Sequence, residues 1–293
     1  MLQEEAPGVR GQSPPAKIFD VSPRRFSTRC PIIRVRRAPG DSRETALSDA
    51  APMAQQREPE KFPLAIVAAL TIAGFFLRLI CARGDLWLDE IWSLQNLASV
   101  HRADEIFYAV SQDNNHFLNS LWLFIVGPQA PPQIIRLASI ILGTLTIPVA
   151  AKLALRIGRA AALAAAALVA FGTIFVHYGS EARGYAGFLL MLFCAAEALE
   201  RCLEDSTAAK PRAGFALAVG FGSLFHIAMI EAAVILVVAT MARIAFRGQP
   251  AREIAVAGRN LAVAAFLGVL PALACLLAGL LYTHKIQFGA QVP

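Results

Sequence analysis

Charged residues are scarce in this sequence: Asp, Glu, Lys and Arg make up 16% of the 293 residues, while apolar residues make up 56%. A soluble domain of ordinary composition carries about 25% charged residues. The mean hydropathy of +0.54 is also too high for such a domain. The composition therefore excludes an ordinary soluble protein and indicates a polytopic membrane protein, so we expect a lipid bilayer to surround most of the chain.

Cysteine is sparse as well. The sequence has five cysteines, and no two of them form a CxxC pair. Cys30 lies near the N-terminus, and the others lie in or beside apolar runs: Cys81, Cys194, Cys202 and Cys275. Cysteines in such positions are usually packing residues, so the sequence argues against a disulfide framework and against a cysteine-based metal site.

The formal net charge is +6, yet the sequence gives no sign of nucleic-acid binding. In a membrane protein an excess of Lys and Arg is typical of cytoplasmic loops, and this is the interpretation that we favour. We therefore expect no nucleic-acid partner, and we use the basic residues to predict which loops are cytoplasmic.

Residues 1–60 are rich in Pro, Arg and Ser and have no sustained apolar periodicity, which predicts a disordered basic tail. The stretch RRFSTRCPIIRVRR within it could lie on anionic lipid. Alternatively, Met53 opens MAQQREPEKFPLAIV, an ordinary start for a bacterial membrane protein. The residues before Met53 would then be an over-extended gene prediction, and both interpretations stay open.

Apolar runs recur along the chain, many of them about twenty residues long, the length that crosses a hydrocarbon core of about 30 Å. The predicted spans are residues 62–81, 134–155, 160–178, 184–202, 213–225, 227–246 and 261–282. We expect an all-α polytopic membrane protein with about seven transmembrane helices, which form one module over residues 61–285. Residues 286–293 are expected to be a truncated end. Near the end of the first span, Arg78 is expected to reach interfacial phosphate.

The run at residues 116–126 is only about eleven residues long and is therefore too short to cross a bilayer. We predict a juxtamembrane helix that lies in the interface. Residues 88–110 carry apolar side chains at near-helical spacing, which predicts a second amphipathic helix of this kind. Both helices would belong to a folded first outer loop over residues 83–133.

The distribution of Lys and Arg supports this arrangement. If residues 117–126 do not span, the basic clusters after the second, fourth and sixth spans share one side of the membrane, which the positive-inside rule makes the cytoplasm. We expect a bacterial inner-membrane protein with a cytoplasmic N-terminus and periplasmic site loops. Three polar clusters then share the periplasmic face: Asp89-Glu90, Asp113 to His116, and SEARGY at residues 180–185.

Each cluster also has a purely structural interpretation. Adjacent acids are usually a solvated loop edge, Asn-Asn-His can cap the following helix, and Glu181 can pair with Arg183 alone. His226, in the turn after the fifth span, is as readily a packed histidine as a ligand. The functional interpretation is that a carboxylate accepts a proton from an attacking hydroxyl while nearby Arg and His side chains hold a lipid phosphate. That chemistry is glycosyl transfer from a lipid-phosphate sugar.

The order of these motifs carries a resemblance. The first span is followed by LWLDEIWSL, DNNHFLNSLW, IIRLASIILGTLTIPVAAKLALRIGRAAALAAAAL, HYGSEARGYAGFLL and LFH. Over about residues 64–245 the chain resembles the GT-C glycosyltransferases of the protein mannosyltransferase and aminoarabinose transferase type, and most of all their bacterial relatives with an RgtA-to-D-like domain. The resemblance implies a seven-span GT-C-like module whose first outer loop carries juxtamembrane helices and the catalytic base.

By this resemblance Asp89 is the catalytic base, with Glu90 beside it as the second catalytic residue. The expected substrate-binding residues are Asp113, Asn115, His116, Glu181, Arg183, Tyr185 and His226. Arg183 and His116 are expected to bind the donor phosphate, and Glu181 to orient Arg183 or the sugar. The implied function is inverting transfer of a sugar from a polyprenyl-phosphate donor to an envelope acceptor (a lipid, a polysaccharide or a protein) at the periplasmic face.

The chain departs from the family in two respects. Members commonly have His-Pro-Pro-Leu where this sequence has His116-Phe117-Leu118-Asn119, which changes the pocket wall, and many continue for further spans, so a truncated copy is expected. Some members need a divalent metal, but these carboxylates do not form a convincing ligand set, so we expect no metal and no other cofactor. The alternative function is non-catalytic: a lipid-linked-sugar translocator or a degenerate scaffold subunit.

Overall fold

The computed structural model describes residues 62–110, 116–204 and 208–284. All elements in these ranges are helical, as the sequence predicts. In chain order they are α1 (Leu64–Cys81), α2 (Leu88–Asn96), the 3₁₀ helix η1 (Ala103–Phe107), α3 (Phe117–Val126), α4 (Pro132–Ile135), α5 (Leu137–Ala154), α6 (Arg159–Phe171), α7 (Thr173–Tyr178), α8 (Tyr185–Glu204), α9 (Ala209–Phe225), α10 (Met229–Phe246) and α11 (Ala251–Thr283). The predictions for residues 1–60, Asp113, Asn115 and residues 286–293 lie outside the described residues.

Four of the helices, α1, α5, α10 and α11, are long and apolar enough to cross a membrane. Helices also lie at the other three predicted spans, which hold α8, α9 and the pair α6–α7. These are shorter or more polar: α6 has 13 residues, α9 has 17, and the second half of α8 carries Glu197, Glu200 and Arg201. A membrane protein is therefore the class that the helices indicate, and the count of seven spans stays a prediction.

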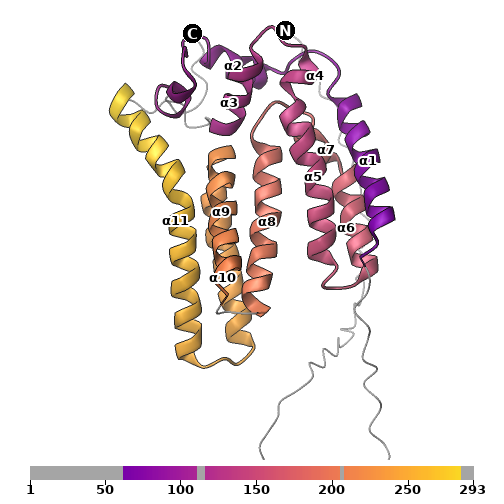
Figure 1. Cartoon of the computed structure of the whole chain (residues 1–293), viewed down its shortest axis with the longest axis vertical. Helices are drawn as coiled ribbons and strands as arrows, with labels where there is room; N and C mark the ends of the chain where they lie inside the picture. Colours follow the sequence, from indigo (N-terminus) through magenta and orange to yellow (C-terminus); the bar gives the residue numbers. More distant parts are fainter. Residues whose placement is uncertain (1–61, 111–115, 205–207, 285–293) are drawn as a thin grey trace, which may run out of the picture. The chain divides into compact units, whose positions relative to one another are not determined.

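The long helices run alternately up and down and pack side by side (Figure 1). α1 packs against α5 and α6, α5 packs against α8, and α9 packs against both α8 and α11. The α9–α11 contact is close because it is made by glycines: a Cβ added at Gly220 would lie 3.2 Å from the carbonyl oxygen of Gly268. Small residues at such interfaces let helix backbones approach each other.

The bundle has two chemically different ends. One end, called the site end below, carries α2, η1, α3, α4 and the connections after α7 and α9 (Figure 1). The opposite end is held by ion pairs: Glu197 binds Arg156 at 3.1 Å and Arg201 at 3.0 Å, and Glu200 binds Arg243. Glu197 and Glu200 thus pair with basic side chains on α8 itself, on α10 and just after α5, which is a structural use.

The prediction for Arg78 is wrong, because its side chain is fully buried within the bundle. Its guanidinium donates to the carbonyl oxygens of Val169 at 2.7 Å and Ala170 at 3.3 Å. These carbonyls belong to the last turn of α6, which ends where Gly172 adopts an extended backbone and interrupts the helical hydrogen-bond ladder. Arg78 supplies the donors that the broken ladder lacks, which explains a charged residue among apolar helices.

Residues 88–110 do not form the single helix that their periodicity predicts. α2 ends at Asn96, and η1 begins only at Ala103. Glu105 accounts for the interruption, because its carboxylate accepts hydrogen bonds from the backbone N–H groups of His101 at 2.7 Å and Arg102 at 3.3 Å and so starts a new helix. By contrast, α3 coincides with the short helix predicted over 117–126, although its orientation in a membrane stays a prediction.

Candidate functional site

The loop of residues 179–184, which joins α7 to α8 and is called the site loop below, is held by side chains from three other helices. The backbone N–H of Ala182 donates to Glu90 on α2 at 2.6 Å, and the carbonyl of Ala182 accepts from Asn119 on α3 at 2.7 Å. Ser139 on α5 donates to the next carbonyl along the loop at 3.1 Å. These hydrogen bonds fix the backbone of the site loop and therefore the Cα positions from which its side chains extend.

Glu90 and Arg136 form a buried ion pair beside the site loop, with 0% and 2% of their side chains exposed. Arg136 Nη2 lies 2.6 Å from Glu90 Oε2, and Arg136 Nε lies 2.9 Å from Glu90 Oε1. Arg136 also donates to the carbonyl oxygens of Ala82 and Asp85, each at 2.8 Å. The pair therefore ties the end of α1 to the start of α2 and the start of α5.

The contacts of Glu90 are those of a structural carboxylate, and its predicted catalytic role stays a prediction. Its two oxygens accept two hydrogen bonds from Arg136, one from the N–H of Ala182 and one from the N–H of Trp87. A carboxylate offers about four acceptor positions, so none is left for a substrate. Burial alone would raise the pKa of Glu90, but these hydrogen bonds outweigh burial and hold the pKa below its ordinary value. These contacts favour a role in which Glu90 positions α2 and the site loop.

Asp89 lies next to Glu90 in sequence but in a different environment, with 50% of its side chain exposed. Its Oδ2 accepts a hydrogen bond from Arg183 Nη1 at 2.7 Å. The guanidinium of Arg183 lies 4.8 Å above the ring of Tyr185, a cation–π contact, and its buried Nε has no hydrogen-bond partner among the described residues. Asp89 is thus an accessible carboxylate, and Arg183 keeps a donor for another anion.

Glu181 is buried in the site loop and pairs with His177 on α7, whose Nε2 lies 2.9 Å from Glu181 Oε1. Burial raises the pKa of Glu181, and the neighbouring carboxylates Glu90 and Asp89 add to the rise against the opposing charges of His177 and Arg183. The structural interpretation in which Glu181 pairs only with Arg183 is therefore wrong, because these residues pair with His177 and Asp89 respectively.

Two imidazoles complete the cluster. His116, just before α3, is buried, and its Nδ1 lies 2.9 Å from the carbonyl oxygen of Phe225. Burial, followed by the neighbouring His226 and Arg183, lowers the pKa of His116 to about 3, so the ring is neutral at pH 7. The pKa of His226 is lowered as well, again chiefly by burial. Tyr185 packs against both rings, with centroids 5.5 Å from His116 and 4.8 Å from His226.

The described site residues that the sequence nominates therefore meet in one cluster at the site end. Two of its members were not predicted. His177 precedes Glu181 by four residues, a helical spacing that could have revealed the pair. Arg136 lies 46 residues from Glu90, and no local pattern links them.

Gly184 makes the approach of Phe225 to His116 possible. A Cβ added at Gly184 would overlap the carbonyl oxygen of Phe225 and lie 2.8 Å from His116 Nδ1. We expect Gly184→Ala to destabilise the protein by about 1–3 kcal/mol, the usual cost of overpacking, because a backbone carbonyl cannot move as freely as a side chain. Thermal unfolding in detergent, followed by loss of soluble protein, measures the change.

Gly214→Ala is the matched control for this variant. A Cβ added at Gly214, within α9, would meet only the Cβ of Ala198 at 3.9 Å, which is ordinary van der Waals contact. This variant should keep or slightly raise the midpoint of unfolding, because alanine favours the helix. Equal midpoints for the two variants would contradict the close approach at Gly184.

Metal binding has no support among the side chains in the described ranges. None of them form a group of three or more His, Cys, Asp or Glu arranged to hold an ion. The expectation that the protein uses no metal and no cofactor stays a prediction.

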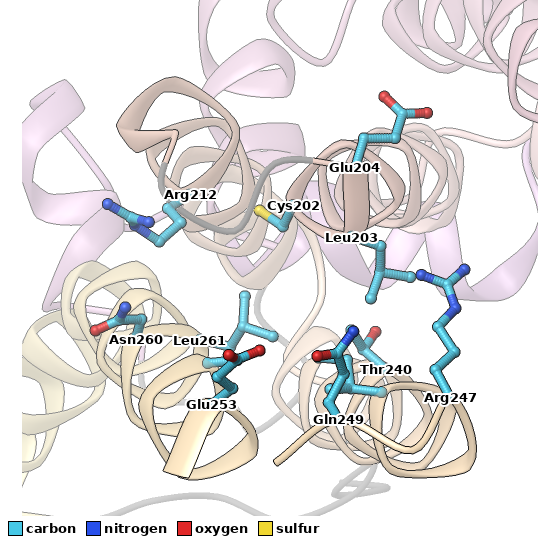
Figure 2. Close-up of a pocket in the computed structure, with 12 residues that line it drawn as sticks. Cys202, Leu203, Glu204, Arg212, Thr240, Arg247, Gln249, Glu253, Asn260 and Leu261 are labelled. Atoms are coloured by element: carbon cyan, nitrogen blue, oxygen red, sulfur yellow. The ribbon is translucent and has the colours of Figure 1, made fainter. Parts of the chain in front are cut away.

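A cavity of about 160 Å³ lies at the opposite end, where α8, α9, α10 and α11 meet. Figure 2 shows Arg212 and Arg247 bordering it from opposite sides, with Cys202 and Glu253 between them. Its lining mixes both signs of charge, and Glu204 is already bound by Arg156. The buried polar atoms without partners in the described part of the chain belong to Arg78, His116 and Arg183, so none lines this cavity. We therefore place the candidate site at the site end.

Comparisons of the chain with protein-family models, with curated proteins and with solved structures give no match. The functional assignment accordingly rests on the residues of the site end and on the resemblance described above.

Proposed function

We propose that this chain is a membrane glycosyltransferase of the GT-C type, which transfers a sugar from a polyprenyl-phosphate donor to an envelope acceptor. In this proposal the seven predicted spans cross the bacterial inner membrane, the N-terminus is cytoplasmic, and the site end faces the periplasm. The observation that carries the proposal is the Asp89–Arg183 contact of 2.7 Å, which pairs an accessible carboxylate with a phosphate-binding side chain at one end of an apolar bundle.

The reaction follows from the chemistry of this pair. Asp89 accepts the proton of the acceptor hydroxyl while the oxygen of that hydroxyl forms a bond to the anomeric carbon of the sugar. The bond between that carbon and the phosphate oxygen breaks at the same time, and the electron pair leaves with the lipid phosphate. Attack from the face opposite the phosphate inverts the anomeric centre. The Oδ1 atom of Asp89 is the atom that we assign to proton transfer, since Oδ2 accepts from Arg183.

Arg183 is assigned to the donor phosphate. A guanidinium carries five N–H donors in a planar fork that suits phosphate oxygens, and only one of them is used by Asp89. The guanidinium lies over the ring of Tyr185, so part of the conformational freedom of the Arg183 side chain is already lost before the donor binds. Arg183 would thus neutralise the charge that develops on the leaving phosphate while it also contacts the base.

A transfer assay tests the proposal. The purified protein is placed in proteoliposomes with polyprenyl phosphate that carries a labelled hexose or pentose, and an envelope fraction is added as acceptor. We expect label to move to the acceptor and unlabelled polyprenyl phosphate to accumulate in equal amount. A protein that neither binds nor consumes any lipid-linked sugar of such a panel would contradict the proposal.

The Arg183→Gln variant is expected to bind the donor roughly 10- to 100-fold more weakly, because a hydrogen bond to a charged group contributes about 1.5–3 kcal/mol. The measurement is the equilibrium binding of polyprenyl phosphate in detergent. Arg102→Gln is the control, since Arg102 is also at the site end but is 73% exposed and pairs with Asp104. Equal loss in both variants would show that the effect is only one of net charge.

A further inference from the structure

The two imidazoles of the site present opposite hydrogen-bonding groups. His116 Nδ1 lies 2.9 Å from a carbonyl oxygen, that of Phe225. A carbonyl oxygen can only accept, so Nδ1 carries the hydrogen of the neutral ring, and Nε2 is left with a lone pair. This Nε2 is buried and has no hydrogen-bond partner within the described residues. A buried acceptor without a donor is costly, so this nitrogen would gain from a donor that a ligand brings.

His226 has the reverse arrangement. The backbone N–H of Ala228 donates to its Nδ1 at 3.1 Å, so Nδ1 holds the lone pair and Nε2 carries the hydrogen of the neutral ring. The centroids of the two imidazole rings are 5.0 Å apart, and Tyr185 packs against both. Neighbouring rings thus carry an acceptor nitrogen, His116 Nε2, and a donor nitrogen, His226 Nε2.

We propose that His116 and His226 together bind one hydroxyl group of the donor sugar. The hydroxyl would donate its hydrogen to His116 Nε2 and accept from the N–H at His226 Nε2, so both rings are satisfied at once. A hydroxyl fits this pair because it is both donor and acceptor, whereas a phosphate oxygen can only accept and is repelled by the lone pair of His116. This inference rests on the proposed function, and it reassigns His116 from the phosphate to the sugar, which leaves Arg183 as the phosphate-binding residue.

The test uses two probes that differ only in the sugar: polyprenyl phosphate, and polyprenyl phosphate that carries a hexose or pentose from the transfer panel. His116→Asn keeps a donor near the Nδ1 position for Phe225 but lacks an acceptor at the Nε2 position. His226→Asn likewise keeps an acceptor for the N–H of Ala228 but lacks the second donor. We expect each variant to bind the sugar-carrying probe about tenfold more weakly and the sugar-free probe within about twofold of the wild type. His116→Gln, whose amide oxygen lies near the Nε2 position, should recover part of the loss.

The outcomes separate the possible roles of the pair. Equal weakening of both probes in His116→Asn would overturn the inference in favour of a phosphate contact, and unchanged binding of both would show a packing role only. If a variant unfolds in detergent, the other histidine variant decides, because the two substitutions lie on different elements. A wild-type protein that binds neither probe would overturn the proposed function itself. The wild type and the histidine variants could instead share the same preference for the sugar-carrying probe. That result would overturn only the histidine inference.

Discussion

The Asp89→Asn substitution is expected to lower the rate of sugar transfer by a factor of about 10² to 10⁴, the usual contribution of a general base. The amide has the shape of the carboxylate and can still accept a hydrogen bond from Arg183, but it cannot take a proton from the acceptor hydroxyl. The loss should therefore fall on the rate of transfer and much less on donor binding. Initial rates of label transfer, together with equilibrium binding of polyprenyl phosphate, measure the two effects separately.

Asp104→Asn is the matched control, because Asp104 is an exposed carboxylate that also lies at the site end and pairs with Arg102 at the surface. Exposed ion pairs contribute little, so this variant should transfer sugar at the wild-type rate. Full activity in Asp89→Asn at equal protein concentration would remove Asp89 from the mechanism. Loss of activity in both variants would indicate a general effect of charge at the site end.

Glu90→Gln is expected to destabilise the folded protein by about 3–5 kcal/mol, because it leaves the buried guanidinium of Arg136 without a countercharge. The midpoint of thermal unfolding in detergent should fall accordingly. Asp85→Asn is the control: the side chain of Asp85 is exposed, and its bond to Arg136 comes from the backbone carbonyl, which the substitution keeps. In the Arg136→Gln background, Glu90→Gln should lower the free energy of unfolding by much less, because the buried charge that Glu90 neutralises is already absent.

The same pair sets a dependence on pH. The pKa of Glu90 is lower in the folded protein than in the unfolded chain, so its contribution to stability is fully present above the ordinary carboxyl pKa of about 4.5 and is lost as the pH falls through the lowered folded value. Wild-type protein should thus lose stability on acidification in this range, and Glu90→Gln should lose less. If the stability of the wild type and that of Glu90→Gln fell equally with pH, this result would contradict the role given to the ion pair.

Local sequence features were sufficient to predict the helical class and the short helix α3. The first follows from composition, and the second follows from the length of one apolar run between polar residues. They also placed Asp89, His116, Glu181 and Arg183 at one end, because alternating helices carry every second connection to the same side. Local sequence features could not predict that Asp89 is exposed while its neighbour Glu90 is buried. Adjacent helical residues point about 100° apart, and which of them is buried depends on Arg136, which comes from a distant part of the chain.

The same limit applies to the buried polar groups. A single arginine near the end of an apolar run normally extends to the interface. Arg78 instead lies inside the bundle, where it binds the carbonyls at the end of α6, a helix that packs against α1. The hydrogen-bonding state of His116 is likewise set by a carbonyl that lies 109 residues further along the chain. Features of this kind depend on tertiary contacts, so periodicity and composition do not reveal them.

The anchoring of the site loop has a consequence for how such a site would choose its ligand. A loop whose amide and carbonyl groups are already bound by α2, α3 and α5 has little freedom left to adapt its shape. The site would then select among ligands by shape, because a ligand must fit a binding surface that is already formed before it arrives. A sugar with one hydroxyl in the wrong configuration would be rejected by stereochemistry rather than by a failure of the protein to move.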